Sequence, residues 1–131
     1  MGADAAALAL AGETVSAQAY LDAQHRRAAF TQQWQGFFAD YDLLLTPTMP
    51  VTAFELGRLA PATIDGRPVP ESFDAWCALA LPANLAGLPA ASVPAGTGRD
   101  GLPVGLQVIG PRWGEVSVLR AAAAAEQALS S

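Results

Sequence analysis

The chain has 131 residues, of which 52% are hydrophobic and 15% charged, with a net charge of −5 at pH 7. The high apolar content excludes a disordered chain, and the acidic balance without any basic run argues against nucleic-acid binding, which needs clustered Lys or Arg. No apolar run approaches the roughly 20 residues of a membrane span, so we expect no membrane insertion.

Residues 1–40 are predicted to be helical. The first 12 residues are rich in alanine, and a second helix begins near Ser16, whose hydroxyl can cap it by accepting a hydrogen bond from the first turn. Apolar side chains then recur with a helical period up to about residue 39, at Tyr20, Ala23, Phe30, Trp34 and Phe37.

Residues 41–47 are predicted to form a strand. The run Leu43-Leu44-Leu45 is apolar throughout and ends at Thr46-Pro47, as a buried strand does when it reaches a proline. Residues 47–71 contain five prolines and little periodicity, so we expect an irregular excursion there.

Residues 72–110 are predicted to hold one helix and two strands. The helix begins at Ser72 or Asp74 and runs through Leu81, and the strands cover residues 90–93 and 104–109, with a turn at 99–101 between them. Residues 113–129 form a closing helix that opens at Gly114 and Glu115. Strands that are apolar throughout need cover on both faces, so the fold class is α/β, a layered α-β-α arrangement in one unit over residues 1–131.

Several catalytic and metal-binding arrangements fit the sequence poorly. No serine lies in a Gly-x-Ser-x-Gly turn, and His25 falls on the exposed side of the long helix, so a Ser-His-Asp triad is not indicated. One His and one Cys cannot make a zinc cluster, and Asp40 with Asp42 is better explained as a polar entrance to a strand than as a cation site. We therefore expect no metal and no cofactor. The single cysteine, Cys77, has apolar neighbours, which favour a buried, protonated thiol over a nucleophile, and it fits a reducing cytoplasm.

Three motifs, taken in order, carry a resemblance to a known family. They are Asp42-Leu43-Leu44-Leu45-Thr46-Pro47-Thr48, residues 84–96 (NLAGLPAASVPAG) and residues 101–107 (GLPVGLQ), followed by a helix from Glu115. In this order and spacing they resemble the C-terminal part of the amidase signature family, over residues 16–129. The family hydrolyses carboxamide C–N bonds with a Ser–Ser–Lys triad, and the resemblance implies a layered α-β-α fold with a mixed central sheet.

Two positions of the second motif have predicted structural roles. The amide of Asn84 can satisfy backbone groups of a loop in which glycine and proline interrupt the hydrogen-bond ladder. Gly87 is expected to take a positive φ.

The resemblance assigns no catalytic residue to this chain. In the family the two serines and the lysine lie N-terminal to the matched region, and all seven basic residues here are arginine, so the chain contains no lysine. It is therefore expected to be a portion of an amidase that is inactive alone and contributes sheet scaffold and part of a substrate pocket. Its expected partners are the missing N-terminal amidase portion and, in the intact protein, a small-molecule amide substrate.

The resemblance also points to four pocket residues, which could instead simply pack in a core. By distance from Asn84, the residues Asp74, Cys77 and Leu81 would line the acyl side of the pocket, and Trp113 would stand at its mouth. The glutamyl-tRNA amidotransferase subunits of the family place an acid where Cys77 stands. A cysteine provides no fixed negative charge, which favours a general amidase for less polar amides.

An alternative from another class is a stand-alone, non-catalytic module that acts through self-association, as a homo-oligomer, or through partner binding. The high apolar content with few charges supports it, because an unpaired strand edge and an uncovered apolar face both promote association.

Overall fold

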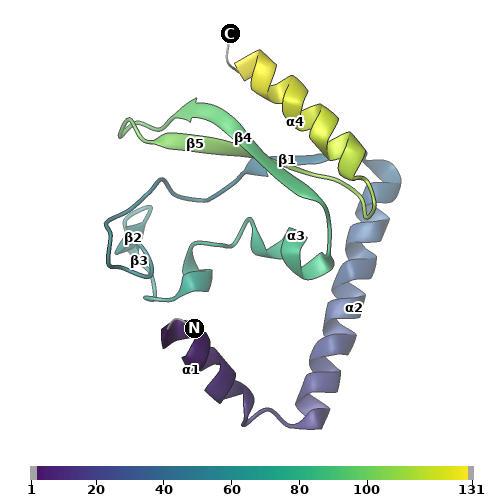
Figure 1. Cartoon of the computed structure of the whole chain (residues 1–131), viewed down its shortest axis with the longest axis vertical. Coiled ribbons are helices and arrows are strands. Elements are labelled where there is room, and N and C mark those ends of the chain that lie inside the picture. Colours follow the sequence, from purple (N-terminus) through teal and green to yellow (C-terminus); the bar gives the residue numbers. More distant parts are fainter. Residues whose placement is uncertain (1–2, 130–131) are drawn as a thin grey trace.

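The computed structural model describes residues 3–129, so residues 1–2 and 130–131 of the predicted unit lie outside the described part. Figure 1 shows how the elements are arranged. In chain order they are α1 (Ala3–Gly12), α2 (Ala17–Asp40), β1 (Leu44–Pro47), β2 (Thr63–Ile64), β3 (Arg67–Pro68), the 3-10 turn η1 (Phe73–Ala75), α3 (Leu81–Ala86), β4 (Ala90–Thr97), β5 (Pro103–Ile109) and α4 (Glu115–Leu129).

The N-terminal helices form as the sequence predicts. The hydroxyl of Ser16 accepts a hydrogen bond of 3.1 Å from the backbone N–H of Ala19, which caps α2. At the other end, extended backbone at Tyr41 stops the helix, and the Tyr41 N–H still donates to the carbonyl of Phe37. None of the residues of α2 is buried, and the element that packs most closely against it is the short helix α3.

The main sheet has three antiparallel strands in the order β1-β5-β4. The central strand β5 places Gln107 between Thr46 of β1 and Ser92 of β4. The turn between β4 and β5 forms at the predicted position, with Gly101 at φ +77° and the Asp100 carboxylate accepting a hydrogen bond from the Leu102 N–H. The sheet with its helices confirms the α/β class.

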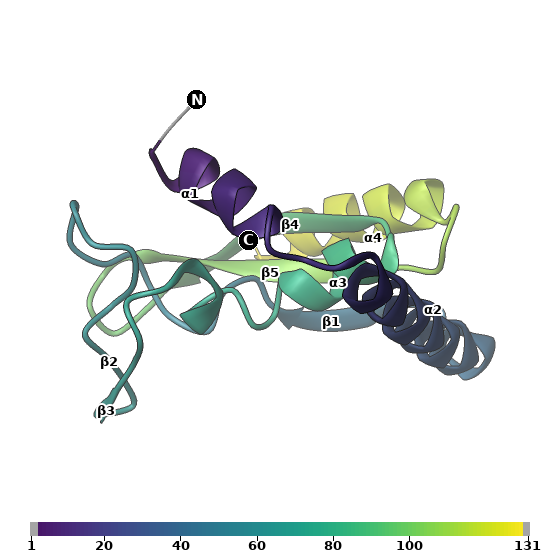
Figure 2. The same ribbon diagram turned by 90° about the horizontal axis from the view of Figure 1, so that it is seen from below.

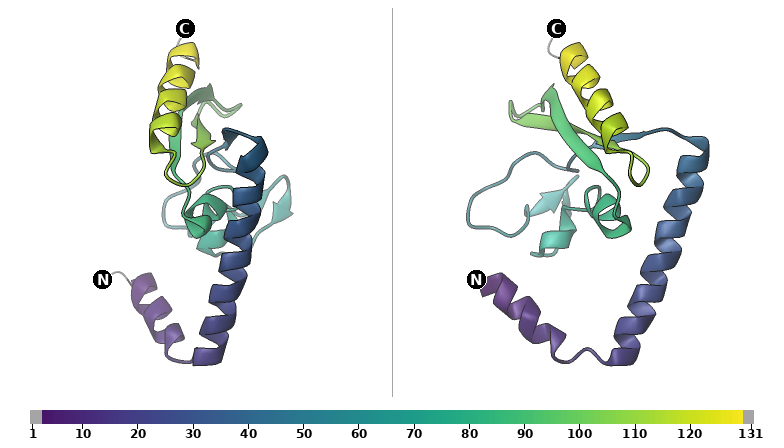
Figure 3. Two further views of the ribbon diagram at one scale, coloured as in Figure 1. Left: turned by 90° about the vertical axis from the view of Figure 1, so that its right-hand side faces the viewer. Right: turned by 45° about the vertical axis from the view of Figure 1, so that its right-hand side comes forward.

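The core lies on one face of this sheet. Val108 and Val93 of the strands pack against Val118 and Ala122 of α4, and all four side chains are buried. Figures 2 and 3 show α4 on one side of the strands and α2 on the other. Because residues alternate between the faces of a strand, Gln107 points away from α4. The stretch that leads into α3 lies on that opposite side, where the Leu79 carbonyl contacts Gln107.

The excursion predicted for residues 47–71 contains a small hairpin. Strands β2 and β3 pair through a turn at Asp65 and Gly66, which both have positive φ, +50° and +71°, as a tight two-residue hairpin turn requires. The predicted irregular character holds for the rest of the segment.

The fold is open rather than closed around one centre. In Figure 1, α1 and α2 stand away from the sheet and form the two arms of a V. Many large apolar side chains are exposed, including Leu10, Tyr20, Leu45, Leu85 and Leu119. Among residues 3–129, no helix has the length and apolar character needed to cross a membrane.

Candidate functional site

The helix predicted from residue 72 or 74 through Leu81 is wrong. The structure has the short turn η1, then a tight non-helical turn over residues 76–80, and only then α3. The reason is Pro82, which is tolerated in the first turn of a helix but would clash with a helical turn before it. Asp74, Cys77 and Leu81 are therefore not stacked on one helix face.

Residues 76–80 are named here the Cys77 turn. They contain Cys77, the middle one of the three predicted pocket residues Asp74, Cys77 and Leu81. The carbonyl of Cys77 accepts hydrogen bonds of 3.0 Å from the N–H groups of Ala80 and Leu81, which closes the turn at the start of α3. Cys77 is 3% exposed, as predicted for a small buried residue. Burial, and secondarily the carboxylate of Asp74, raises the pKa of its thiol above 9.0, so it stays protonated at neutral pH.

The other two members of the set on this segment face solvent. Asp74 lies in η1 and is exposed, and Leu81 at the start of α3 is 39% exposed. The structure thus brings together a buried, neutral thiol at Cys77 and the exposed carboxylate of Asp74, while Leu81 contacts Cys77 through its backbone N–H.

Hydrogen bonds from Trp76 and Gln107 attach the Cys77 turn to neighbouring segments. On one side the indole N–H of Trp76 donates a 2.8 Å hydrogen bond to the Leu59 carbonyl of the excursion. On the other, the Nε2 of Gln107 donates to the Leu79 carbonyl at 3.0 Å and to the Oγ1 of Thr46, also at 3.0 Å. Gln107 was not among the site residues predicted from the sequence. Its signal was a lone amide inside an apolar strand, which in a buried sheet requires a partner.

A second polar contact lies on the same face of the sheet. The hydroxyls of Thr48 and Ser92 are 2.6 Å apart and cross over Gly105 of the central strand. A Cβ at Gly105 would lie 2.7 Å from each hydroxyl oxygen, closer than real contacts allow. Glycine is thus required there by the close approach of two side chains.

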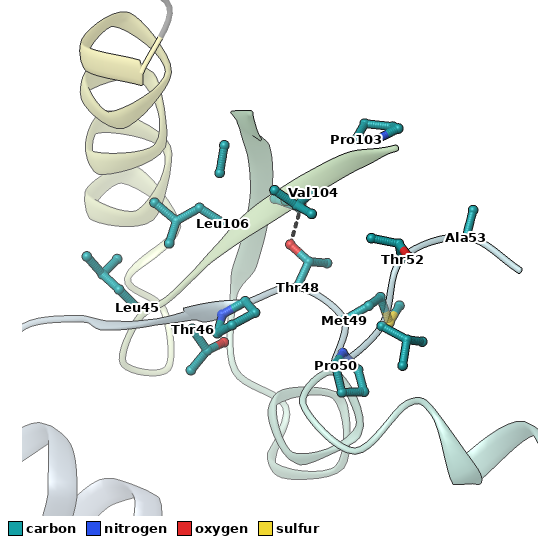
Figure 4. A pocket seen from close by; sticks show the side chains of 15 residues that line it. Leu45, Thr46, Thr48, Met49, Pro50, Thr52, Ala53, Pro103, Val104 and Leu106 are labelled. Atoms are coloured by element: carbon teal, nitrogen blue, oxygen red, sulfur yellow. Dashed lines mark hydrogen bonds between the residues drawn. The ribbon is translucent and has the colours of Figure 1, made fainter. Parts of the chain in front are cut away.

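A hollow of about 700 Å³ opens beside β1 and β5, with the loop 49–53 along one side (Figure 4). Leu45, Val104 and Leu106 line it with Met49 and Val51, and hydroxyls of threonine and serine are its polar groups. Leu45 faces the same side as Val108 but remains 56% exposed, because α4 packs chiefly against β4. The hollow carries no charged side chain, so it suits packing against apolar groups.

Trp113 lies apart from the Cys77 turn, in the connection between β5 and α4. It is 79% exposed, its φ is +68°, and the Arg112 guanidinium lies 5.1 Å from its ring centroid. In the part of the chain that the structure describes, no hydrogen bond or ring contact joins Trp113 to Asp74, Cys77 or Leu81.

Other candidate groups are scattered. His25 is exposed on α2, as predicted, and the side chain of Asn84 is exposed on α3 rather than turned toward a loop backbone. Gly87 has φ +67° and ends α3, with its N–H donating to the last carbonyls of that helix, as predicted. Within residues 3–129, no group of three or more His, Cys, Asp and Glu side chains could hold a metal ion.

Comparison with protein families matches residues 4–119 of the chain to the family described as Amidase. Among characterised relatives, the chain is 45% identical over 108 residues to a subunit of the glutamyl-tRNA(Gln) amidotransferase of Brevibacillus brevis. That alignment covers 82% of this chain and 21% of the relative.

Solved structures agree with this match. A bacterial aryl acylamidase of the amidase signature family superposes with a TM-score of 0.77 and 33% identity over 98% of this chain and 26% of its own. A crystal structure of an amidase gives a TM-score of 0.86 and 28% identity, over 98% of this chain and 29% of its own. The chain thus spans between about a fifth and three tenths of the length of these relatives.

Proposed function

Because this chain belongs to the amidase signature family, we propose that it is the C-terminal portion of an amidase that hydrolyses carboxamide C–N bonds. In this proposal the chain supplies sheet scaffold and one wall of the substrate pocket, and it is inactive alone. The wall comprises Asp74, Cys77 and Leu81, with Trp113 as a more distant aromatic. A cytoplasmic location belongs to the same proposal and is supported by the free thiol of Cys77.

The proposal rests on two facts together: most of the chain matches the Amidase family, and the chain contains no lysine. The Amidase match extends over residues 4–119, yet the chain covers only 21% of its amidotransferase relative and has no lysine among its seven basic residues. A Ser–Ser–Lys mechanism needs an amine that can act as the base, and the guanidinium of arginine stays protonated and cannot replace it. The catalytic base must therefore come from residues outside this chain.

The remaining amidase portion is the proposed partner for the open surfaces. The hollow at Leu45, Val104 and Leu106 and the aromatic face of α2 at Phe30, Trp34 and Phe37 are apolar, and their side chains are only partly covered. Covering such surfaces is favourable at roughly 25 cal/mol per Å² of apolar area removed from water. Relatives that are several times longer have the chain length to do so.

We place the substrate among amides with a weakly polar acyl side. Cys77 is buried with a protonated thiol, which offers no anion to hold an amino group of the substrate. The nearby anion, Asp74, is exposed. The similarity to an amidotransferase subunit keeps glutamine in the test panel as the competing substrate.

A chimera tests the proposal directly. The aryl acylamidase aligns over 98% of this chain, so its corresponding segment is replaced by residues 1–131 and the product is assayed with a chromogenic anilide and with glutamine. We expect anilide hydrolysis, reduced but saturable, and little release of ammonia from glutamine. The acylamidase truncated before the exchanged segment is the control, and it should be inactive.

Two results would contradict the proposal. A monodisperse chimera with native-like circular dichroism but no hydrolysis of any amide would show that this segment does not complete the site. Saturable amide turnover by the mass-verified 131-residue chain alone would show that the catalytic groups lie within it.

The alternative function is a non-catalytic module that acts by self-association or partner binding. The exposed apolar side chains, such as Leu45, favour it as well. Static light scattering separates the two proposals. A defined homo-oligomer of the chain that persists when the complementary acylamidase portion is added favours the module. Replacement of that oligomer by a one-to-one complex favours the amidase portion.

A further inference from the structure

We propose that Gln107 is a positioning residue, whose side-chain amide fixes the Cys77 turn against the centre of the sheet. The meaning of this role for a substrate rests on the proposed function, because only there is the Cys77 turn a pocket wall. The two hydrogen bonds that Gln107 donates, to Thr46 and to Leu79, are named here the Gln107 bridge. This bridge is a property of the chain itself and can be tested without any substrate.

The burial of Gln107 shows that its amide is committed to the protein rather than to water. Gln107 is 5% exposed, and among the described residues it is the buried polar residue, on the face of the sheet opposite the core. The two protons of its Nε2 are matched by two acceptors at 3.0 Å, the Thr46 hydroxyl and the Leu79 carbonyl. A buried amide is tolerated in an apolar strand only when its donors are used.

The two acceptors belong to different parts of the structure, one to the sheet and one to the Cys77 turn. Thr46 belongs to β1 and is already fixed beside Gln107 by the register of the sheet. Leu79 belongs to the Cys77 turn, which has no strand pairing of its own. The bond to Thr46 therefore satisfies one Nε2 proton within the sheet, whereas the bond to Leu79 attaches the turn to the sheet.

The hydrogen bond on the other side of the turn, from Trp76, does not attach it to the sheet. Trp76 donates to the carbonyl of Leu59, which lies in the irregular excursion and not in a strand or helix. The hydrogen bond from Gln107 to the Leu79 carbonyl, by contrast, links the turn directly to the central strand. Loss of the bridge should therefore loosen Cys77 locally while the β1-β5-β4 sheet and its core with α4 persist.

The lone cysteine provides the readout. Since the chain contains one cysteine, the rate at which an aromatic disulfide reagent labels it reports only the exposure of Cys77, by local opening of the turn or by global unfolding. Gln107→Met keeps the length of the side chain and removes both donors. We expect native-state labelling to accelerate about tenfold, the change produced when a part-buried carbonyl loses its partner.

Thr46→Val is the matched control. It removes the acceptor on the sheet side and leaves the bond to Leu79 intact, so labelling should change by no more than about threefold. Gln107→Asn is a milder second variant, one methylene too short to reach both acceptors, and its labelling rate should fall between the native and Gln107→Met rates. Urea unfolding of each variant gives the global stability against which the labelling rate is compared.

The outcomes separate cleanly. A faster labelling rate for Gln107→Met than its loss of global stability explains, with Thr46→Val near the native rate, supports the bridge. Unchanged labelling in Gln107→Met or, if that variant does not fold, in Gln107→Asn, overturns it. Equal acceleration in the Thr46 and Gln107 variants, each matching its loss of stability, also overturns it, since Gln107 would then only stabilise the sheet. An inactive chimera would refute the proposed function and leave these labelling results in force.

Discussion

Substitution of Gly105 by alanine tests how closely the two hydroxyls cross the central strand. The added Cβ would lie 2.7 Å from the Oγ of Ser92 and the Oγ1 of Thr48, and 3.2 Å from the Thr48 Cβ. Both hydroxyls must rotate away, which breaks their 2.6 Å hydrogen bond at a cost of about 1 kcal/mol. Crowding against the Thr48 Cβ adds about 1–2 kcal/mol, and replacing a strand glycine returns about 0.5–1 kcal/mol.

The free energy of unfolding should therefore fall by about 2 kcal/mol in Gly105→Ala, measured by urea denaturation with an unchanged slope. A double-mutant cycle with Ser92→Ala isolates the cause. Without the serine hydroxyl, one obstacle and the hydrogen bond are already gone, so Gly105→Ala should cost less than about 1 kcal/mol in that background. Equal costs in both backgrounds, or a stabilising Gly105→Ala, would refute the packing described here.

Three further predictions concern the core and two titrating groups. Val108→Ala should lower the free energy of unfolding by about 2–3 kcal/mol in urea, since that side chain is 0% exposed beneath α4. Hydrogen bonds from Thr52 and from a backbone N–H lower the pKa of Asp100 below 3.8, so its contribution to stability is present above that pH and is lost as the pH falls through the lowered value. The stability difference between the native chain and Asp100→Asn should accordingly vanish in acid. Because burial raises the pKa of Cys77 above 9.0, thiolate absorbance should appear at higher pH in the folded chain than in urea, and stability should fall as the pH rises past 9.0.

Local signals in the sequence predicted much of the fold. The cap at Ser16, the positive φ of Gly87 and the turn before Gly101 each depend on residues within a few positions, and all three are confirmed. The family motifs likewise place β4, β5 and α4 in the correct order. These features follow from backbone chemistry that a single stretch of sequence carries.

Features that depend on distant residues escaped prediction. The helix expected through Leu81 is wrong because Pro82 permits a helix to start there but not to continue from before it. The Cys77 turn is instead shaped by the carbonyl of Leu59 and by Gln107, 17 and 28 residues away from their respective partners. Pairs so far apart leave no periodic trace in the sequence.

The four side chains at the centre of the core have a consequence for the order of folding. Val93, Val108, Val118 and Ala122 all lie within residues 90–129, so a β-hairpin and the helix after it can assemble from contacts that are near in sequence. By contrast, β1 must find its partner across the chain, as in the pairing of Leu44 with Ile109, and closing so long a loop is slow. We expect the C-terminal third to collapse first as a nucleus, and β1 with the helices before it to join afterwards.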